Sequence, residues 1–80
     1  MRIEIRLLTQ MKRYLPDPEL AGDIRPIDIK PNAAVKDVFK DLGIPLDTPK
    51  VIMLNDRQGT LEDVLKAGDR VTVFPPVGGG

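Results

Sequence analysis

The last seven residues, FPPVGGG, have the residue types and spacing best suited to chemistry. Pro75 and Pro76 fix two φ angles and lack two backbone donors, so they should carry the chain away from the preceding strand in an extended form. The glycines at 78–80 have no Cβ and make the narrowest segment that a polypeptide can present. The six residues 75–80 reach at most about 20 Å, far enough to carry a terminal carboxylate into another protein's buried active site.

Such a segment supports acyl chemistry at Gly80, which we expect to bear a free carboxylate. An enzyme that uses ATP can convert a carboxylate to an acyl adenylate, which sulfur or nitrogen nucleophiles then attack. A glycine run can also be a frayed end or a remnant of a linker. The proline pair and the apolar Val77 stand directly before the glycines with no polar spacer, and this combination favours a reactive tail.

The rest of the chain lacks the usual catalytic groups, because it contains no cysteine, histidine or serine. These absences exclude disulfides, thiolate metal sites, the commonest general base and the two commonest nucleophiles. Carboxylates cluster at 17–19 and 62–63, where solvated turns are a better interpretation than a metal site or an acid pair. No phosphate-binding motif occurs. We therefore expect a chain that is not catalytic alone and binds no cofactor or metal itself, so that any ATP is used by a partner enzyme.

The length of 80 residues predicts one domain, which buries roughly 60% of its unfolded surface. Twelve basic and twelve acidic residues cancel, and only Lys12 and Arg13 place two cations side by side. This balance, with three aromatic residues in all, argues against nucleic acid as a partner. The N-terminus alternates charged and aliphatic residues, so neither a signal peptide nor a membrane span is expected. We expect a cytoplasmic protein with no membrane partner.

The first 30 residues predict two strands joined by an irregular connection. Residues 3–7 alternate aliphatic and charged side chains, the pattern of a strand with one buried face. Residues 9–23 are rich in proline and glycine and predict an irregular connection with one helical turn around residues 10–14. Residues 27–30 predict a second short strand. Pro26 cannot donate to a strand ladder, so this strand either lies at a sheet edge or starts after the proline.

An amphipathic helix follows, because four apolar residues recur at helical spacing: Val35, Val38, Phe39 and Leu42. Asn32 is the best available N-cap, Gly43 suits the left-handed position after the helix, and Pro45 blocks continuation.

The remaining residues predict two more strands. Residues 50–54 are apolar on both faces and predict a strand inside the sheet, closed by a turn at 55–59. Residues 60–63 resemble a capping pattern for a short helical turn, with Leu61, Val64 and Leu65 beneath the sheet. Residues 67–69 predict a tight turn into the final strand at 70–74, with Val71 and Val73 facing inward.

This order of elements predicts an α+β fold of the β-grasp (ubiquitin-like) type, with a mixed sheet, one main helix packed across it and a flexible C-terminal glycine tail. The first two strands should be antiparallel, and the final strand should pair with the first. We expect residues 1–74 to form the β-grasp domain and residues 75–80 to form the extended reactive tail.

The chain resembles the MoaD/ThiS family of ubiquitin-like sulfur carriers along essentially its whole length. The resemblance lies in the RIEIRLL opening, the NAAVKDVFKDLGIP helix, the AGDRVTV strand and the terminal FPPVGGG. The terminal PPVxGG pattern is the specific part. Gly78 departs from the small residue, such as Ser or Ala, that the family more often has there. The middle segment KVIMLNDRQGTLEDVL matches only loosely, which leaves the pathway open.

The resemblance implies that an ATP-dependent, E1-like adenylating enzyme activates Gly80. It implies that Gly80 carries the adenylate and then a thiocarboxylate that donates sulfur. Gly79 is the preceding residue, which must have no side chain. The prolines and the valine before the glycines favour the MoaD branch, the small subunit of molybdopterin synthase. That branch implies a larger catalytic subunit as a second partner, and molybdopterin (molybdenum or tungsten cofactor) biosynthesis as the destination of the sulfur.

Three alternatives remain open from the sequence. The activated Gly80 could form an isopeptide with a lysine of a target protein, as a ubiquitin-like modifier does. The sulfur could serve thiamine or another metabolite. The domain could also be a non-covalent interaction module with an inert tail. We expect partner contacts along the stretch Phe74, Pro75, Pro76, Val77 and Gly78, although Phe74 could instead close the core. Arg2, Arg6 and Arg70 are expected to be solvated residues of the sheet face.

Overall fold

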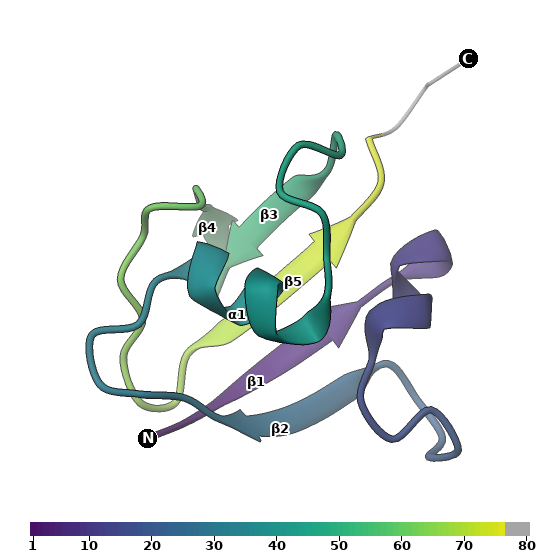
Figure 1. Ribbon diagram of the computed structural model, residues 1–80, viewed down its shortest axis with the longest axis horizontal. Helices are drawn as coiled ribbons and strands as arrows, with labels where there is room; N and C mark the ends of the chain where they lie inside the picture. The colour runs from purple at the N-terminus through teal and green to yellow at the C-terminus, as the bar shows by residue number, and fades with distance from the viewer. Residues whose placement is uncertain (77–80) are drawn as a thin grey trace.

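The computed structural model describes residues 1–76 of the chain, which form a mixed sheet covered on one face by a helix (Figure 1). Its elements are β1 (Arg2–Leu7), the 3-10 helix η1 (Thr9–Tyr14), β2 (Ile24–Asp28), α1 (Val35–Leu42), β3 (Val51–Leu54), β4 (Arg57–Gln58) and β5 (Arg70–Phe74). The strand order is β2-β1-β5-β3-β4. β1 and β5 are parallel, and the other neighbouring pairs are antiparallel. The predicted α+β architecture is confirmed, including the antiparallel first pair and the pairing of the last strand with the first.

The core lies between the sheet and α1, where the alternation of β1 and β5 meets the apolar stripe of the helix. Its fully buried side chains are Ile3, Ile5, Leu7, Val35, Val38, Phe39, Leu65, Val71 and Val73. Alternate residues of a strand point to opposite faces, so the same alternation leaves polar residues of both strands on the outer face of the sheet. The inward parity predicted for both strands is confirmed.

The start of α1 differs from the prediction that Asn32 is the N-cap. The helix begins at Val35, and Asn32 lies in the preceding turn with a left-handed φ of 67°. The free N–H groups of the first turn find other acceptors: Val35 N–H donates to Asp63 O, and Lys36 N–H to Leu61 O, both at 3.0 Å. Tertiary contacts with residues 61–63 therefore replace a side-chain cap. Gly43 ends the helix in the predicted left-handed conformation, with a φ of 80°.

Residues 57–65 depart most from the prediction. Arg57 and Gln58, predicted within a turn, form β4 against β3 and so make the far edge of the sheet. The predicted helical turn at 60–63 is wrong: the segment is a turn in which Thr60 N–H donates to the Asp63 carboxylate at 2.8 Å. Leu65 is buried as expected. Val64 is 55% exposed instead, and its backbone forms an isolated bridge with Ala34.

β2 is an edge strand, as the proline predicts, but it begins at Ile24 and so includes Pro26. Leu7 N–H donates to Asp23 O, and Ile29 N–H donates to Met1 O, so the odd-numbered residues of this segment bond to β1. Pro26 has the opposite parity, so its missing N–H falls on the free edge of the sheet. Proline is tolerated there because no ladder bond is lost.

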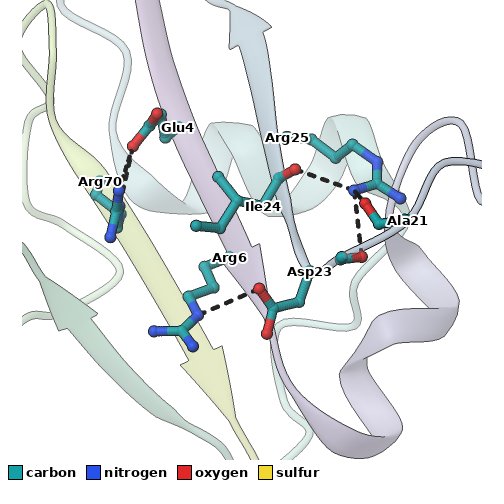
Figure 2. A network of polar contacts seen from close by, with 8 residues as sticks. Glu4, Arg6, Ala21, Asp23, Ile24, Arg25 and Arg70 are labelled. Atoms are coloured by element: carbon teal, nitrogen blue, oxygen red, sulfur yellow. Dashed lines mark hydrogen bonds and ion pairs between the residues drawn. The ribbon is translucent and has the colours of Figure 1, made fainter.

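Sequence reasoning missed a buried cation in β2. Arg25 is only 3% exposed, and no carboxylate pairs with it within the described residues. Its guanidinium instead donates to six backbone carbonyls of the connection that precedes and enters β2, belonging to Pro16, Asp17, Leu20, Ala21, Gly22 and Ile24. Figure 2 shows the Arg25 side chain directed into this loop. The Arg25 side chain thus stabilises residues 16–24, a segment with few buried apolar side chains.

Replacing Arg25 with methionine should destabilise the domain by about 2–4 kcal/mol, because the carbonyls that it bonds lose their donors while the apolar volume is kept. Urea unfolding measures the change. Arg2→Met is the matched control, because the ion pair of Arg2 with Asp28 is exposed and such pairs contribute little. Equal stability of Arg25→Met and the wild type would contradict the role given to Arg25.

Candidate functional site

The candidate site starts where the two central parallel strands end. Leu7 is opposite Val73 in the ladder, and Leu8 N–H extends the pairing by donating to Val73 O at 3.0 Å. Phe74 ends β5, and Pro75 and Pro76 follow it. This geometry places the start of the predicted tail beside the turn that leads from β1 into η1. Figure 1 shows the described chain leaving the sheet at the end of β5, close to the ends of β1 and η1.

A shallow apolar pocket of about 370 Å³ lies at this point. We call it the tail-root pocket; its lining residues are Leu8, Thr9, Phe74, Pro75 and Pro76. Its two walls come from segments far apart in the sequence, which the parallel pairing of β1 and β5 brings together. It lies where the described residues end, directly before Val77.

Phe74 belongs to this pocket and not to the core. It has the outward parity of β5 opposite Val51, is half-buried, and is absent from the buried cluster under α1. The sequence left both placements open, and the structure decides for the surface. An aromatic side chain beside an apolar pocket is a suitable anchor for a partner.

The other predicted site residues fall into two groups. Pro75 is half-buried and Pro76 is exposed, and both line the tail-root pocket. Val77, Gly78, Gly79 and Gly80 lie outside the described residues. The role of Gly80 as the carrier and that of Gly79 as the preceding residue without a side chain therefore stay predictions. The partner contacts and the boundary between domain and tail also stay predictions.

The charged residues of the outer sheet face pair with each other. Arg70 bonds the Glu4 carboxylate at 2.8 Å across the central strands, and Arg6 bonds Asp23 at 3.3 Å (Figure 2). Arg6 and Arg70 were expected to be solvated residues of the sheet face. Both are partly exposed, as expected, although each is paired with a carboxylate. Their charges are balanced within the chain, so the apolar tail-root pocket is the better candidate for recognition.

Three groups have shifted pKa values. The hydrogen bond and the attraction between Arg2 and Asp28 raise the pKa of Arg2 and hold the pKa of Asp28 below its ordinary value, in a pair that is exposed. Partial burial lowers the pKa of Lys50, and nearby Asp47 opposes this shift. The Lys50 amine lies 5.6 Å from the centre of the Phe39 ring, so this lysine covers part of the core edge. None of these three groups lines the tail-root pocket.

The described residues contain no cluster of three or more acidic, cysteine or histidine side chains able to hold a metal ion. In this same part of the chain, no helix is long and apolar enough to cross a membrane.

Comparison with known proteins defines the class. The sheet and helix are those of a ubiquitin-like β-grasp protein, and solved structures share the fold over the whole chain. The chain belongs to the Mut7-C ubiquitin family, whose model matches residues 1–78. That description names a ubiquitin-like domain and specifies neither sulfur transfer nor a pathway. No curated protein matches the sequence.

Three solved structures illustrate the likeness. SAMP1 from Haloferax volcanii has a TM-score of 0.75 at 20% identity, with both chains covered completely. Molybdopterin converting factor subunit 1, as assigned in Pyrococcus furiosus, has a TM-score of 0.71 at 21% identity, covering 95% of this chain and 98% of that one. The complex of subunits 1 and 2 of the molybdopterin-converting factor from Helicobacter pylori contains a chain with a TM-score of 0.65 at 24% identity, with both chains covered completely.

The resemblance inferred from the sequence is thereby confirmed. The family is ubiquitin-like, and of these similar structures one contains a subunit of a molybdopterin-converting factor and another is assigned as such a subunit. At these identities the structural likeness establishes the fold, and the activity has to be argued from the site.

Truncating Phe74 to alanine should cost about 1 kcal/mol of stability, because this side chain is half-buried outside the core. The same truncation of the fully buried Phe39 should cost about 3–5 kcal/mol, because it leaves a cavity under the sheet. Urea unfolding of both variants makes the comparison. Equal losses would mean that Phe74 packs in the core and does not belong to the surface.

Proposed function

We propose that this chain is a sulfur carrier whose Gly80 is adenylated by an E1-like enzyme and converted to a thiocarboxylate, with molybdopterin (molybdenum or tungsten cofactor) biosynthesis as the destination of the sulfur. The observation that carries the proposal is the position of the tail: two prolines and a glycine run follow the central strand of a β-grasp fold. The likeness to subunits of molybdopterin converting factors favours this destination.

The chemistry divides between this chain and its partners. The carboxylate oxygen of Gly80 attacks the α-phosphate of ATP, which releases pyrophosphate and leaves an acyl adenylate. Sulfur at the sulfide level, written as HS⁻, then attacks the acyl carbon and displaces AMP, which leaves the thiocarboxylate and releases one proton. The chain contains no cysteine, so it has no thiol of its own to capture the activated carbonyl. Its part is to present a narrow terminus and a docking surface, while the partner enzyme binds ATP.

A larger synthase-type subunit is the proposed second partner. The Helicobacter pylori structure is a complex of subunits 1 and 2 of a molybdopterin-converting factor, which is the arrangement proposed for this chain. The same tail has to reach the adenylating enzyme first and this subunit afterwards, so the tail-root pocket, lined in part by Phe74 and the two prolines, is the proposed docking surface for each partner in turn. Apolar pockets with an aromatic anchor are common centres of such interfaces.

Intact mass spectrometry tests the proposal. The protein is incubated with ATP, a sulfur source and the adenylating enzyme of its host, then treated with a thiol-selective alkylating reagent. Because the chain has no cysteine, alkylation that maps to Gly80 reports a thiocarboxylate. Alkylation is needed because oxidation of a methionine nearly matches the mass change of an oxygen-to-sulfur exchange. An unalkylated terminus, under conditions where the enzyme converts another carrier, would overturn the proposal.

The proposal also requires that the natural protein ends at Gly80, which the intact mass of the protein isolated from its host measures directly. A variant lacking Gly80 should lose alkylation completely. Its urea unfolding should match that of the wild type, because β5 ends at Phe74, six residues before Gly80. Gly78→Ala is the matched control in the tail. It should keep most of the alkylation at Gly80, because the MoaD/ThiS family, which the sequence resembles, more often has Ser or Ala at this position.

A second candidate is a ubiquitin-like protein modifier, which the likeness to SAMP1 favours because the similar Haloferax volcanii protein is a small archaeal modifier. It uses the same activated Gly80, with a lysine amine in place of sulfur. Conjugates that survive denaturation and leave residues 71–80 on a target lysine after trypsin digestion would support the modifier, because Arg70 is the last trypsin site in the chain. Alkylated Gly80 without such conjugates would support the sulfur carrier.

A further inference from the structure

The residues with left-handed backbone conformations show one exception to an otherwise consistent pattern. Seven of the described residues have a positive φ: Thr9, Asp17, Gly22, Asn32, Gly43, Asn55 and Gly68. Six of them are glycine, asparagine or aspartate, the types that tolerate this region best. Thr9 is the exception, with a φ of 51°. A β-branched residue is strained there, because its Cβ substituents crowd the backbone.

The local structure gives no reason for threonine at this position. Thr9 is exposed, and among the described residues the one hydrogen bond of its side chain runs from Oγ1 to the carbonyl of its neighbour Leu8, at 2.7 Å. Asparagine or glycine would adopt the same conformation with less strain. The chain has asparagine at two other such positions, Asn32 and Asn55. The fold alone therefore does not account for the threonine.

The location of Thr9 points to a different reason. Thr9 lines the tail-root pocket, beside Phe74, Pro75 and Pro76. Strained residues in folded proteins concentrate where a side chain has a function that outweighs its cost. Here the one strained β-branched residue of the described chain coincides with the apolar pocket at the start of the tail.

We infer that Thr9 is retained at a strained position because its side chain contacts the enzyme that adenylates Gly80, where an apolar side chain of that enzyme occupies the tail-root pocket. Pro75 and Pro76 are at once pocket wall and start of the tail, and Gly80 lies at most about 20 Å further along the chain. A protein that encloses Gly80 must therefore lie close to Thr9. Thr9 is one of the residues that line the pocket, and its hydroxyl donates to the carbonyl of Leu8. The inference rests on the proposed function.

The test separates stability from recognition in one variant. Thr9→Asn relieves the strain, so its Tm should rise by about 4–8 °C. The KM for the carrier in ATP–pyrophosphate exchange by the host's adenylating enzyme should rise about tenfold, with kcat nearly unchanged. The matched control is Asn32→Thr, which creates the same strain at an exposed positive φ that does not line the tail-root pocket. It should lower the Tm and leave the KM unchanged.

Each outcome decides a separate part of the inference. An equal or lower Tm for Thr9→Asn overturns the claim of strain, whatever the exchange assay gives. A higher Tm with an unchanged KM overturns the contact with the enzyme. If the enzyme does not adenylate the wild type, calorimetric titration of the enzyme decides instead: tighter binding of the wild type than of Thr9→Asn supports the contact while the proposed function fails. Absence of binding by the wild type overturns both.

Discussion

The parallel pairing of β1 and β5 at the centre of the sheet is the constraint on which the rest of the structure depends. Ile5 lies opposite Val71 and Leu7 opposite Val73, so both strands present their apolar parity to α1. A tight turn cannot join two parallel strands. The whole segment between Leu7 and Arg70 in the sequence therefore forms the crossover connection. Both strands end at the same end of the sheet, which brings the turn after β1 against the prolines after β5. The tail-root pocket is a direct consequence of this topology.

A domain of this size has few side chains with which to build a core, so polar contacts organise the long connections. Residues 61–63 supply the carbonyls that complete the first turn of α1, and Arg25 supplies the donors for the loop before β2. Both devices satisfy backbone groups that a short, proline-rich chain cannot pair within helices or strands. The loop held by Arg25 follows η1, and η1 contacts β5. The connection between β1 and β2 thus contacts β5 at the end of the sheet where the tail begins.

Much of this fold could be predicted from the sequence, because period-2 and helical patterns report directly which side chains are buried. The strands at 3–7 and 70–74 and the apolar stripe of α1 are of this kind. The failures have a common cause in contacts between distant segments. Asn32 has the right chemistry for a cap, but the backbone of residues 61–63 takes that place. Arg25 lies just before the strand predicted at 27–30 and has no pattern that marks it as buried, and only the fold brings six carbonyls around it. In the site, Phe74 and the prolines were predictable, whereas Leu8 and Thr9 became visible only through the pairing of β1 with β5.

The chain contains no cysteine, histidine or serine, so the folded domain lacks the side chains that most often act as nucleophiles or general bases. Under the proposed function, reactivity belongs to the tail and to the partner enzymes, so selection on the remaining residues concerns folding and recognition alone. Residues that serve folding alone should have the type that their backbone conformation prefers, as asparagine and glycine do at the turns. A residue that departs from this preference identifies a requirement other than folding. Thr9 is such a residue, and its place beside Pro75 indicates that recognition at the start of the tail, and not stability, determines its identity.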